Sequence, residues 1–289
     1  MESKRTILIT GASSGFGFGA AQALAARGHH VIASMRGVDG KNADKAKQLL
    51  EAAAQGGHKL DVVEIDVTDD DSVAAGVAAA VEKAGRVDIL INNAGVGTWG
   101  AQEGFSSQQV LHMLNVNVVG VLRMNKAVLP HMRAAGSGYL IYVSSGLGRI
   151  LFPFLGPYSG SKHAIEAIAE SGSYELDLMG IQTTILQPGA YGTSFLMNSI
   201  TPADDVLTSQ PPLKAFFDGF AGAFAERAKA GGLGNPQEIV DALVELVEAD
   251  KDARPLRRAV GVDVQHGVGA INDAAAQVQA QIKQSFSGG

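Results

Sequence analysis

The stretch TILITGASSGFG at residues 6–17 predicts how the chain begins to fold. A short β-branched apolar run ends directly in a glycine-rich turn, and residues 18–27 have helical character. Glycine allows a sharp turn and a close approach of backbone to a phosphate, and the N-terminus of the following helix adds N–H donors and partial positive charge. We therefore expect a strand, a pyrophosphate-binding turn and a helix.

Short apolar runs alternate with longer segments of helical periodicity along the rest of the chain. The candidate strands are residues 6–10, 30–35, 61–65, 87–92, 138–144 and 181–187. Most are continuously apolar, as expected of strands that are covered on both faces. Six such units favour an α/β fold with a doubly wound, mostly parallel sheet and helices on both faces, since a barrel would need eight.

Several of the intervening helices begin at recognisable capping residues. The candidates are Thr68 with Asp71 and Ser106 with Gln109, at capping-box spacing, and Asn235 with Pro236 and Glu238. Such residues satisfy or complement the free N–H groups of a first turn, so they predict where these helices start.

Composition excludes several classes of protein. The 289 residues carry a net charge of −6, are 46% apolar and include no cysteine, so a disordered chain, a disulfide framework, a thiolate metal site and a cysteine nucleophile are excluded. The seven histidines show no metal-ligand spacing, which predicts no metal. No run approaches the roughly 18 apolar residues of a membrane span, and there is no basic tail. We expect a cytoplasmic protein with no nucleic-acid or membrane partner.

Residues 190–234 interrupt the alternation. This segment lacks a strand pattern but contains Pro202, Pro211, Pro212, Phe216, Phe217, Phe220 and Phe224. Long insertions of this kind are often lids, so we expect a helical substrate-binding lid after strand six, within a single domain of residues 1–289. The alternative is a helical excursion whose phenylalanines complete the core. The tail after Asp263 is rich in alanine and glutamine and is expected to fray.

Further motifs follow the glycine-rich turn in a fixed order. They are TGxxxGxG at 10–17, NNAG at 92–95, Asn117 in NVVG, Ser145 after the fifth strand, YSGSK at 158–162, QPG at 187–189, and Thr193. This series resembles the short-chain dehydrogenase/reductase family over about the first 195 residues. The resemblance implies a Rossmann-like fold, hydride transfer between a nicotinamide cofactor and a carbonyl or alcohol, and a homodimer or homotetramer.

Tyr158 and Lys162 are four residues apart at a predicted helix start, so their side chains share a face. A phenol titrates near about 10, but a nearby ammonium group and a helix N-terminus favour the phenolate. Ser145 ends its strand at the ligand-binding edge of the sheet, where its hydroxyl can bond a carbonyl oxygen. Ser144 competes for this role, because the motif is a serine pair.

The resemblance assigns roles to four catalytic residues. It implies that Tyr158 is the general acid/base, that Ser145 orients the substrate oxygen, and that Lys162 also holds the nicotinamide ribose. Asn117 is implied to fix a water in a proton relay. The alternative for Asn117 is a buried polar group that bends its helix.

The predicted cofactor site combines the glycine-rich turn with the later motifs. Its residues are Gly11, Ser13, Ser14, Gly15, Phe16, Gly17, Arg36, Asp66, Val67, Asn93, Ala94, Gly95, Tyr158, Lys162, Pro188, Gly189 and Thr193. By resemblance, Asp66 and Val67 lie at the adenine ring. Arg36 follows strand two where an NAD site usually has an acid, which favours NADP(H) over NAD(H). A solvated loop charge is the alternative for Arg36.

The substrate is expected to be a hydrophobic ketone or aldehyde and its alcohol. Phe195, Leu196 and Met197 and the later phenylalanines suggest an apolar pocket. Residues 150–155 either line the same pocket or form a subunit contact. A non-catalytic NADP-binding sensor is the alternative function, although such proteins typically lose the tyrosine or lysine. An extended-branch epimerase would need another glycine spacing and a larger C-terminal domain.

Overall fold

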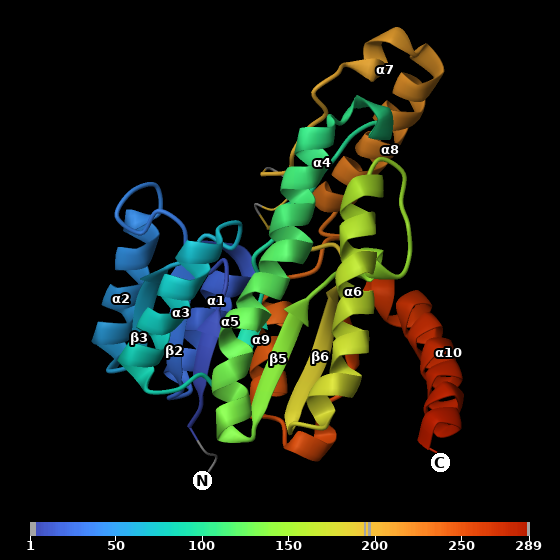
Figure 1. The fold of residues 1–289 in the computed structure, drawn as a ribbon. Helices are drawn as coiled ribbons and strands as arrows, with labels where there is room; N and C mark the ends of the chain where they lie inside the picture. The colour runs from blue at the N-terminus through green and yellow to red at the C-terminus, as the bar shows by residue number, and fades with distance from the viewer. Residues whose placement is uncertain (1–3, 194, 196–197, 288–289) are drawn as a thin grey trace.

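The computed structural model describes residues 4–193, 195 and 198–287 (Figure 1). In this part of the chain, seven parallel strands form one sheet in the order β3-β2-β1-β4-β5-β6-β7. The strands are β1 Thr6–Ile9, β2 His30–Met35, β3 Leu60–Glu64, β4 Ile89–Asn92, β5 Gly138–Val143, β6 Ile181–Pro188 and β7 Arg257–Val260. The order reverses between β1 and β4, so the α/β doubly wound, Rossmann-like prediction is confirmed.

Helices cover both faces of the sheet. They are α1 Gly15–Ala26, α2 Ala43–Gly56, α3 Asp70–Ala84, α4 Ser107–Leu114, α5 Gly120–Ala135, α6 Gly156–Asp177, α7 Val206–Ser209, α8 Pro211–Lys229, α9 Pro236–Glu248 and α10 Val262–Ser287. Short turns are η1 Gln102–Gly104, the π-helical η2 Asn115–Val119, η3 Gly146–Gly148 and η4 Lys251–Ala253. Buried residues of α1, α2 and α9 share one apolar cluster, and those of α3, α5 and α6 share the other.

The central strands pack in both clusters because successive side chains point to opposite faces. Ile7 and Ile9 of β1 belong to the cluster under α1 and α9, whereas Leu8 belongs to the opposite cluster. All three side chains are fully buried. This two-sided burial explains why the strands are continuously apolar in sequence.

One strand and one helix were not expected from the sequence. β7 pairs with β6 in the register Ile185↔Arg257. The sequence did not predict this strand, because its two arginines are typical of a solvated loop. The tail predicted to fray after Asp263 instead forms α10. Val268 is fully buried there, and Asn272 Nδ2 donates to Gln187 Oε1 at 2.7 Å, so the tail is anchored to the sheet.

The capping predictions hold at two of three helix starts. Ser106 forms its capping box with Gln109, and Asn235 caps α9. The prediction for Thr68 and Asp71 is wrong by one residue, because Asp69 caps α3 by accepting from the Ser72 amide at 2.7 Å. The Thr68 hydroxyl is committed elsewhere and donates to Asp66 at 2.7 Å.

Residues 190–234 contain α7 and α8, which Figure 1 shows extending beyond the sheet. No residue of α8 is buried, so its phenylalanines do not complete the core, and that alternative is wrong. Instead Trp99 packs on Phe217, Phe220 and Phe224, with ring centroids 6.1, 5.7 and 5.8 Å away. This aromatic cluster holds α8 against the body of the protein.

Candidate active site

The glycine-rich turn joins β1 to α1. Gly11 has a φ of +67°, and a Cβ there would lie 2.8 Å from the Ala94 Cα, so both conformation and space require glycine. Gly15 has a φ of +55° but faces open space. Ser14 precedes α1 without a side-chain cap, which leaves first-turn amides for a ligand. This uncapped, glycine-lined helix start fits the pyrophosphate of a dinucleotide.

The NNAG segment braces this turn from β4. Asn93 Nδ2 donates to the carbonyl oxygens of Thr10 at 2.9 Å and Gly11 at 3.2 Å. The amides of Asn93 and Ala94 both donate to Thr10 Oγ1 at 3.0 Å. A Cβ at Gly17 would lie 2.4 Å from Asn93 Nδ2, so Gly17 makes room for this brace rather than contacting the cavity. The two motifs form one rigid unit.

Tyr158, Ser145 and Lys162 meet at the carboxyl edge of the sheet. Burial raises the pKa of the Tyr158 phenol above its ordinary value, and a hydrogen bond with Ser145 offsets only part of this rise, so the prediction that Lys162 and the helix start favour the phenolate is wrong. The Lys162 ammonium lies 5.7 Å from the Tyr158 ring centroid and donates to the Val143 carbonyl at 2.9 Å. Burial lowers the pKa of Lys162 to about 8, against the opposing charge of Glu166. The three groups can bond a carbonyl oxygen and move a proton to it.

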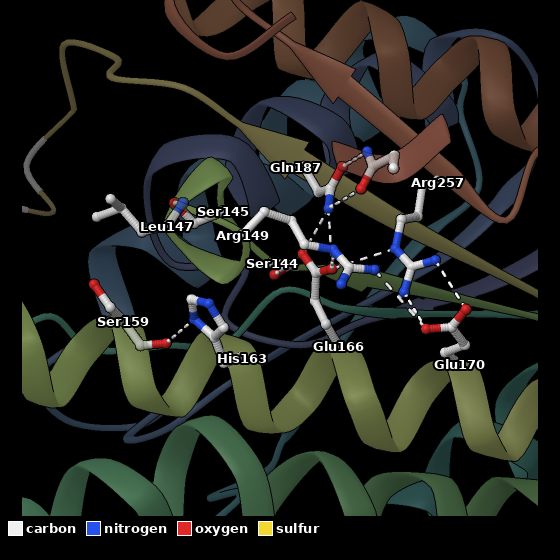
Figure 2. A network of polar contacts seen from close by, with 11 residues as sticks. Ser144, Ser145, Leu147, Arg149, Ser159, His163, Glu166, Glu170, Gln187 and Arg257 are labelled. Atoms are coloured by element: carbon white, nitrogen blue, oxygen red, sulfur yellow. Dashed lines mark hydrogen bonds and ion pairs between the residues drawn. The ribbon is translucent and has the colours of Figure 1, made fainter. Parts of the chain in front are cut away.

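The two serines after β5 point in different directions (Figure 2). Ser144 Oγ donates to the buried Glu166 carboxylate at 3.0 Å. Ser145 contacts Tyr158 and also accepts from the Leu147 amide at 3.1 Å. The geometry therefore favours Ser145 over Ser144 as the partner of the substrate oxygen.

Asn117 lies in the π-helical turn η2 and behind the cavity wall. Its Oδ1 accepts from the Val96 amide at 2.8 Å, and its Nδ2 donates to the Val96 carbonyl at 2.8 Å and Ser161 Oγ at 3.0 Å. The side chain thus ties the irregular turn to the loop after β4 and to α6. Such turns often occur at functional sites. Its role in a water relay stays a prediction.

Arg36 and Asp66 lie together where β2 and β3 end. An Arg36 guanidinium nitrogen is 3.6 Å from Asp66 Oδ2. The Glu64 carboxylate accepts from the amides of Gly37 and Val38, both at 2.7 Å, and so fixes the loop after Arg36. Lys41, in the same loop, also lines the cavity and was not identified from the sequence.

A cavity of about 810 Å³ connects these groups. Every predicted catalytic or cofactor residue lines it except Gly17 and Asn117, which pack against the lining residues Asn93 and Gly95. Its apolar part includes Trp99, Phe195, Phe220 and Phe224, whereas Leu196 and Met197 lie outside the described residues. Trp99 was not recognised as a wall residue, because a lone tryptophan has no motif around it.

Residues 150–155 contribute to the cavity and to the surface. Ile150, Phe152 and Leu155 line the cavity, while the Leu151 side chain is 69% exposed. The Phe154 backbone has a φ of +63°, and its ring lies 4.9 Å from that of Phe217. The segment therefore lines the pocket and supports α8 through a conformation that non-glycine residues rarely adopt.

Within the described parts of the chain, no group of three or more histidine, aspartate or glutamate side chains could hold a metal ion. No helix among residues 4–193, 195 and 198–287 is both long and apolar enough to span a bilayer.

Relatives share this arrangement over most of the chain. 3-Ketodihydrosphingosine reductase of Bacteroides thetaiotaomicron is 40% identical over 66% of each chain. Human retinol dehydrogenase 8 is 34% identical over 89% of this chain and 82% of its own. The structure of gluconate 5-dehydrogenase from Burkholderia cenocepacia, in complex with NADP and tartrate, has 26% identity and a TM-score of 0.73 over 90% of this chain and 95% of its own.

The sequence pattern of the family described as short chain dehydrogenase matches residues 5–203. This is more than half of the chain, and it includes the glycine-rich turn, Asn117, Ser145, Tyr158 and Lys162. The protein therefore belongs to the short-chain dehydrogenase family and is an oxidoreductase of alcohol and carbonyl groups that uses a nicotinamide cofactor.

Proposed function

We propose that the protein is an NADP(H)-dependent oxidoreductase that interconverts a hydrophobic ketone or aldehyde and its alcohol, with Tyr158 as general acid/base. The observation that carries this proposal is the convergence of Tyr158, Ser145 and Lys162 on one cavity, whose outer part is aromatic. A polar edge with a protonated phenol beside an apolar wall suits a small carbonyl group on a hydrophobic body.

In the reductive direction, the Ser145 hydroxyl donates to the substrate carbonyl oxygen and orients it. When bound, the reduced nicotinamide supplies a hydride to the carbonyl carbon. As the carbon–oxygen π electrons move onto the oxygen, Tyr158 transfers its proton to that atom. The buried Lys162 ammonium stabilises the phenolate that remains and holds the nicotinamide ribose. Asn117 keeps the neighbouring turns in place and takes part in proton resupply.

Preference for NADP(H) follows from the loop after β2. Arg36 and Lys41 both line the cavity there. The Arg36 ion pair with Asp66 is half-exposed, and such pairs contribute only about 0–1 kcal/mol, so a 2′-phosphate can replace it. Asp66 then remains beside the adenine with Val67.

The substrate is inferred from the aromatic wall and from the names of relatives. Trp99, Phe152 and α8 surround the outer cavity, so residues 190–234 serve as a lid over the substrate body. Two relatives are named for 3-ketodihydrosphingosine and retinol. We also expect a homodimer or homotetramer, which a mass measurement in solution will test.

Tyr158→Phe tests the proposed chemistry. With NADPH and a panel of hydrophobic ketones, aldehydes and steroids, the variant should lose turnover by about 10²–10⁴-fold, because no other group supplies the proton. Its NADPH affinity, followed through the fluorescence of Trp99, should stay near that of the wild type. Lack of wild-type turnover across the panel, together with normal NADPH binding, would favour the non-catalytic sensor.

Arg36→Ala tests the cofactor preference. Loss of a charge-assisted hydrogen bond of about 1.5–3 kcal/mol should weaken NADPH binding by roughly 10–150-fold and leave NADH binding unchanged. Lys47→Ala is the matched control, because it removes the same charge from an exposed site on α2, where Lys47 pairs with Glu51. Wild-type protein that binds NADH as tightly as NADPH would reject the preference.

A further inference from the structure

Glu166 is a buried carboxylate that the proposed reaction does not yet use. It lies on α6 one helical turn after Lys162 and two turns after Tyr158, so the three residues share a face. Its side chain is only 2% exposed. A buried carboxylate is costly unless it is paired and hydrogen-bonded, so its contacts show what it stabilises.

The Glu166 carboxylate connects the ends of two neighbouring strands (Figure 2). Its Oε1 accepts from Ser144 Oγ at 3.0 Å and from Gln187 Nε2 at 2.8 Å. Ser144 immediately precedes Ser145, and Gln187 immediately precedes Pro188, which lines the predicted cofactor site. One side chain therefore fixes the two loops that present the catalytic serine and the cofactor cleft.

Two arginines neutralise the other carboxylate oxygen. Glu166 Oε2 lies 2.9 Å from Arg149 Nε and 3.3 Å from Arg257 Nε. Arg149 follows η3, and Arg257 begins the pairing of β7 with β6. A second carboxylate, Glu170, pairs with Arg257 at 2.6 Å and with Arg149 at 3.8 Å. Glu166 is thus the member of this network nearest to the reacting groups.

The loop of η3 is shaped around the same carboxylate. A Cβ at Gly148 would lie 2.5 Å from Glu166 Oε1 and 2.9 Å from Ser144 Oγ. These distances are shorter than real Cβ contacts, so a side chain at this position would displace either Glu166 or Ser144. The close approach is independent of the charges and shows that the loop after Ser145 packs directly on Glu166.

The negative charge of Glu166 also opposes the fall in the pKa of Lys162 that burial causes. Burial lowers the pKa of Lys162 to about 8, and the charge of Glu166 raises it. Tyr158 also faces Lys162, whereas Arg149 and Arg257 face Glu166 and are shared with Glu170. Without the carboxylate charge, the pKa of Lys162 would fall further, and its ammonium would be lost at a lower pH.

We propose that Glu166 is a positioning residue for hydride transfer, which holds the loops carrying Ser145 and Pro188 and maintains the charge of Lys162. The proposal rests on the roles proposed for Ser145, Tyr158 and Lys162. It assigns two separable tasks to one carboxylate: its charge acts on Lys162, and its two oxygens fix the loops.

Glu166→Gln removes the charge while keeping the size of the side chain. The alkaline limb of kcat/KM for carbonyl reduction should move to lower pH by about one unit, in keeping with the effect of a nearby opposite charge. The pH at which NADPH affinity weakens should move in the same direction, because Lys162 holds the ribose. This second measurement does not depend on turnover.

Glu170→Gln is the matched control. It removes one carboxylate charge from the same two arginines but touches neither Ser144 nor Gln187 in this network. Glu170→Gln should lower stability. It should leave unchanged both the alkaline limb of kcat/KM and the pH at which NADPH affinity weakens. If the alkaline limb of kcat/KM and the pH at which NADPH affinity weakens are the same in the wild type, Glu166→Gln and Glu170→Gln, the proposal is overturned. Glu166 would then have a purely structural role.

Two further variants keep the test decisive if Glu166→Gln does not fold. Glu166→Asp retains the charge but shortens the reach, so kcat should fall about tenfold, the cost of one lost hydrogen bond, without movement of the limbs. Gly148→Ala displaces the Glu166 carboxylate or the Ser144 hydroxyl without changing any charge, and it should act in the same way. Unchanged kcat in both variants would contradict the loop-fixing role. Absence of wild-type turnover alongside a normal pH limb in NADPH binding would instead contradict the proposed function.

Discussion

The two sides of the cavity are built differently. On the cofactor side, the glycine-rich turn and the NNAG segment are joined by hydrogen bonds and rest on fully buried strand residues such as Leu8 and Leu90. On the substrate side, α8 has no buried residue and is held by ring contacts with Trp99 and Phe154. We therefore expect binding at the proposed cofactor site to depend on the stability of the whole fold, and the proposed substrate wall to change at little cost in stability.

The largest difference between the sides should appear on truncating one apolar side chain in each. Leu90→Ala, in the centre of the sheet, should lower the free energy of unfolding by about 2–5 kcal/mol. Phe220→Ala breaks ring contacts with Trp99, Phe152 and Phe154 that contribute about 0.5–1.5 kcal/mol each, but mainly to the docking of α8.

Urea unfolding and steady-state kinetics together measure this difference. Phe220→Ala should change global unfolding little and should raise KM for bulky hydrophobic carbonyl compounds. Its NADPH affinity should be unaffected, because the ring contacts of Phe220 are with Trp99, Phe152 and Phe154, outside the glycine-rich turn. Equal loss of unfolding free energy in the two variants would show that α8 belongs to the same cooperative unit as the sheet.

A smaller effect is expected from adding one methyl group on each side. Gly11→Ala forces a left-handed φ on a residue with a Cβ, which costs about 1–2 kcal/mol, and places that Cβ against the Ala94 backbone. Gly222→Ala lies on an exposed face of α8 with open space around it and should favour the helix by about 0.5–1 kcal/mol. Thermal unfolding with and without NADPH checks both, and a stable Gly11→Ala with normal NADPH affinity would contradict the rigid-turn interpretation.

The sequence predicted what local pattern determines. The six expected strands are present with ends within two residues of the prediction, because two-sided burial makes them continuously apolar. The glycine-rich turn follows from residue type alone, since Gly11 and Gly15 adopt positive φ. The YSGSK motif likewise fixes the relative positions of Tyr158 and Lys162, because a helix places residues four apart on one face.

The sequence missed features that depend on distant partners. Arg257 resembles a loop charge until its partner Glu166, 91 residues earlier in the chain, is known. The anchor of α10 depends on the contact between Asn272 and Gln187, which are 85 residues apart. Lys41 and Trp99 line the cavity only because of how their loops fold. These residues have no periodicity or motif that single-chain patterns could detect.

The smallest effect should come from one carboxylate on each side whose pKa is held below its usual value. For Asp66, burial raises the pKa, but hydrogen bonds from Thr68 and the charge of Arg36 outweigh it. For Asp205, the hydrogen bonds from Thr208 at the start of α7 lower the pKa.

A lowered folded-state pKa contributes stability above the unfolded value of about 3.9, and this contribution is lost as the pH falls through the folded-state value. Asp66→Asn should therefore reduce the free energy of unfolding at about pH 6 and converge with the wild type as the pH falls below the folded-state pKa of Asp66. Asp205→Asn should track the wild type throughout, because α7 can open locally without unfolding the sheet and Asn still caps a helix. The opposite result, in which the unfolding free energy of Asp205→Asn converges with that of the wild type at low pH and that of Asp66→Asn does not, would contradict this interpretation. It would mean that the substrate side, and not the cofactor side, is coupled to the stability of the whole fold.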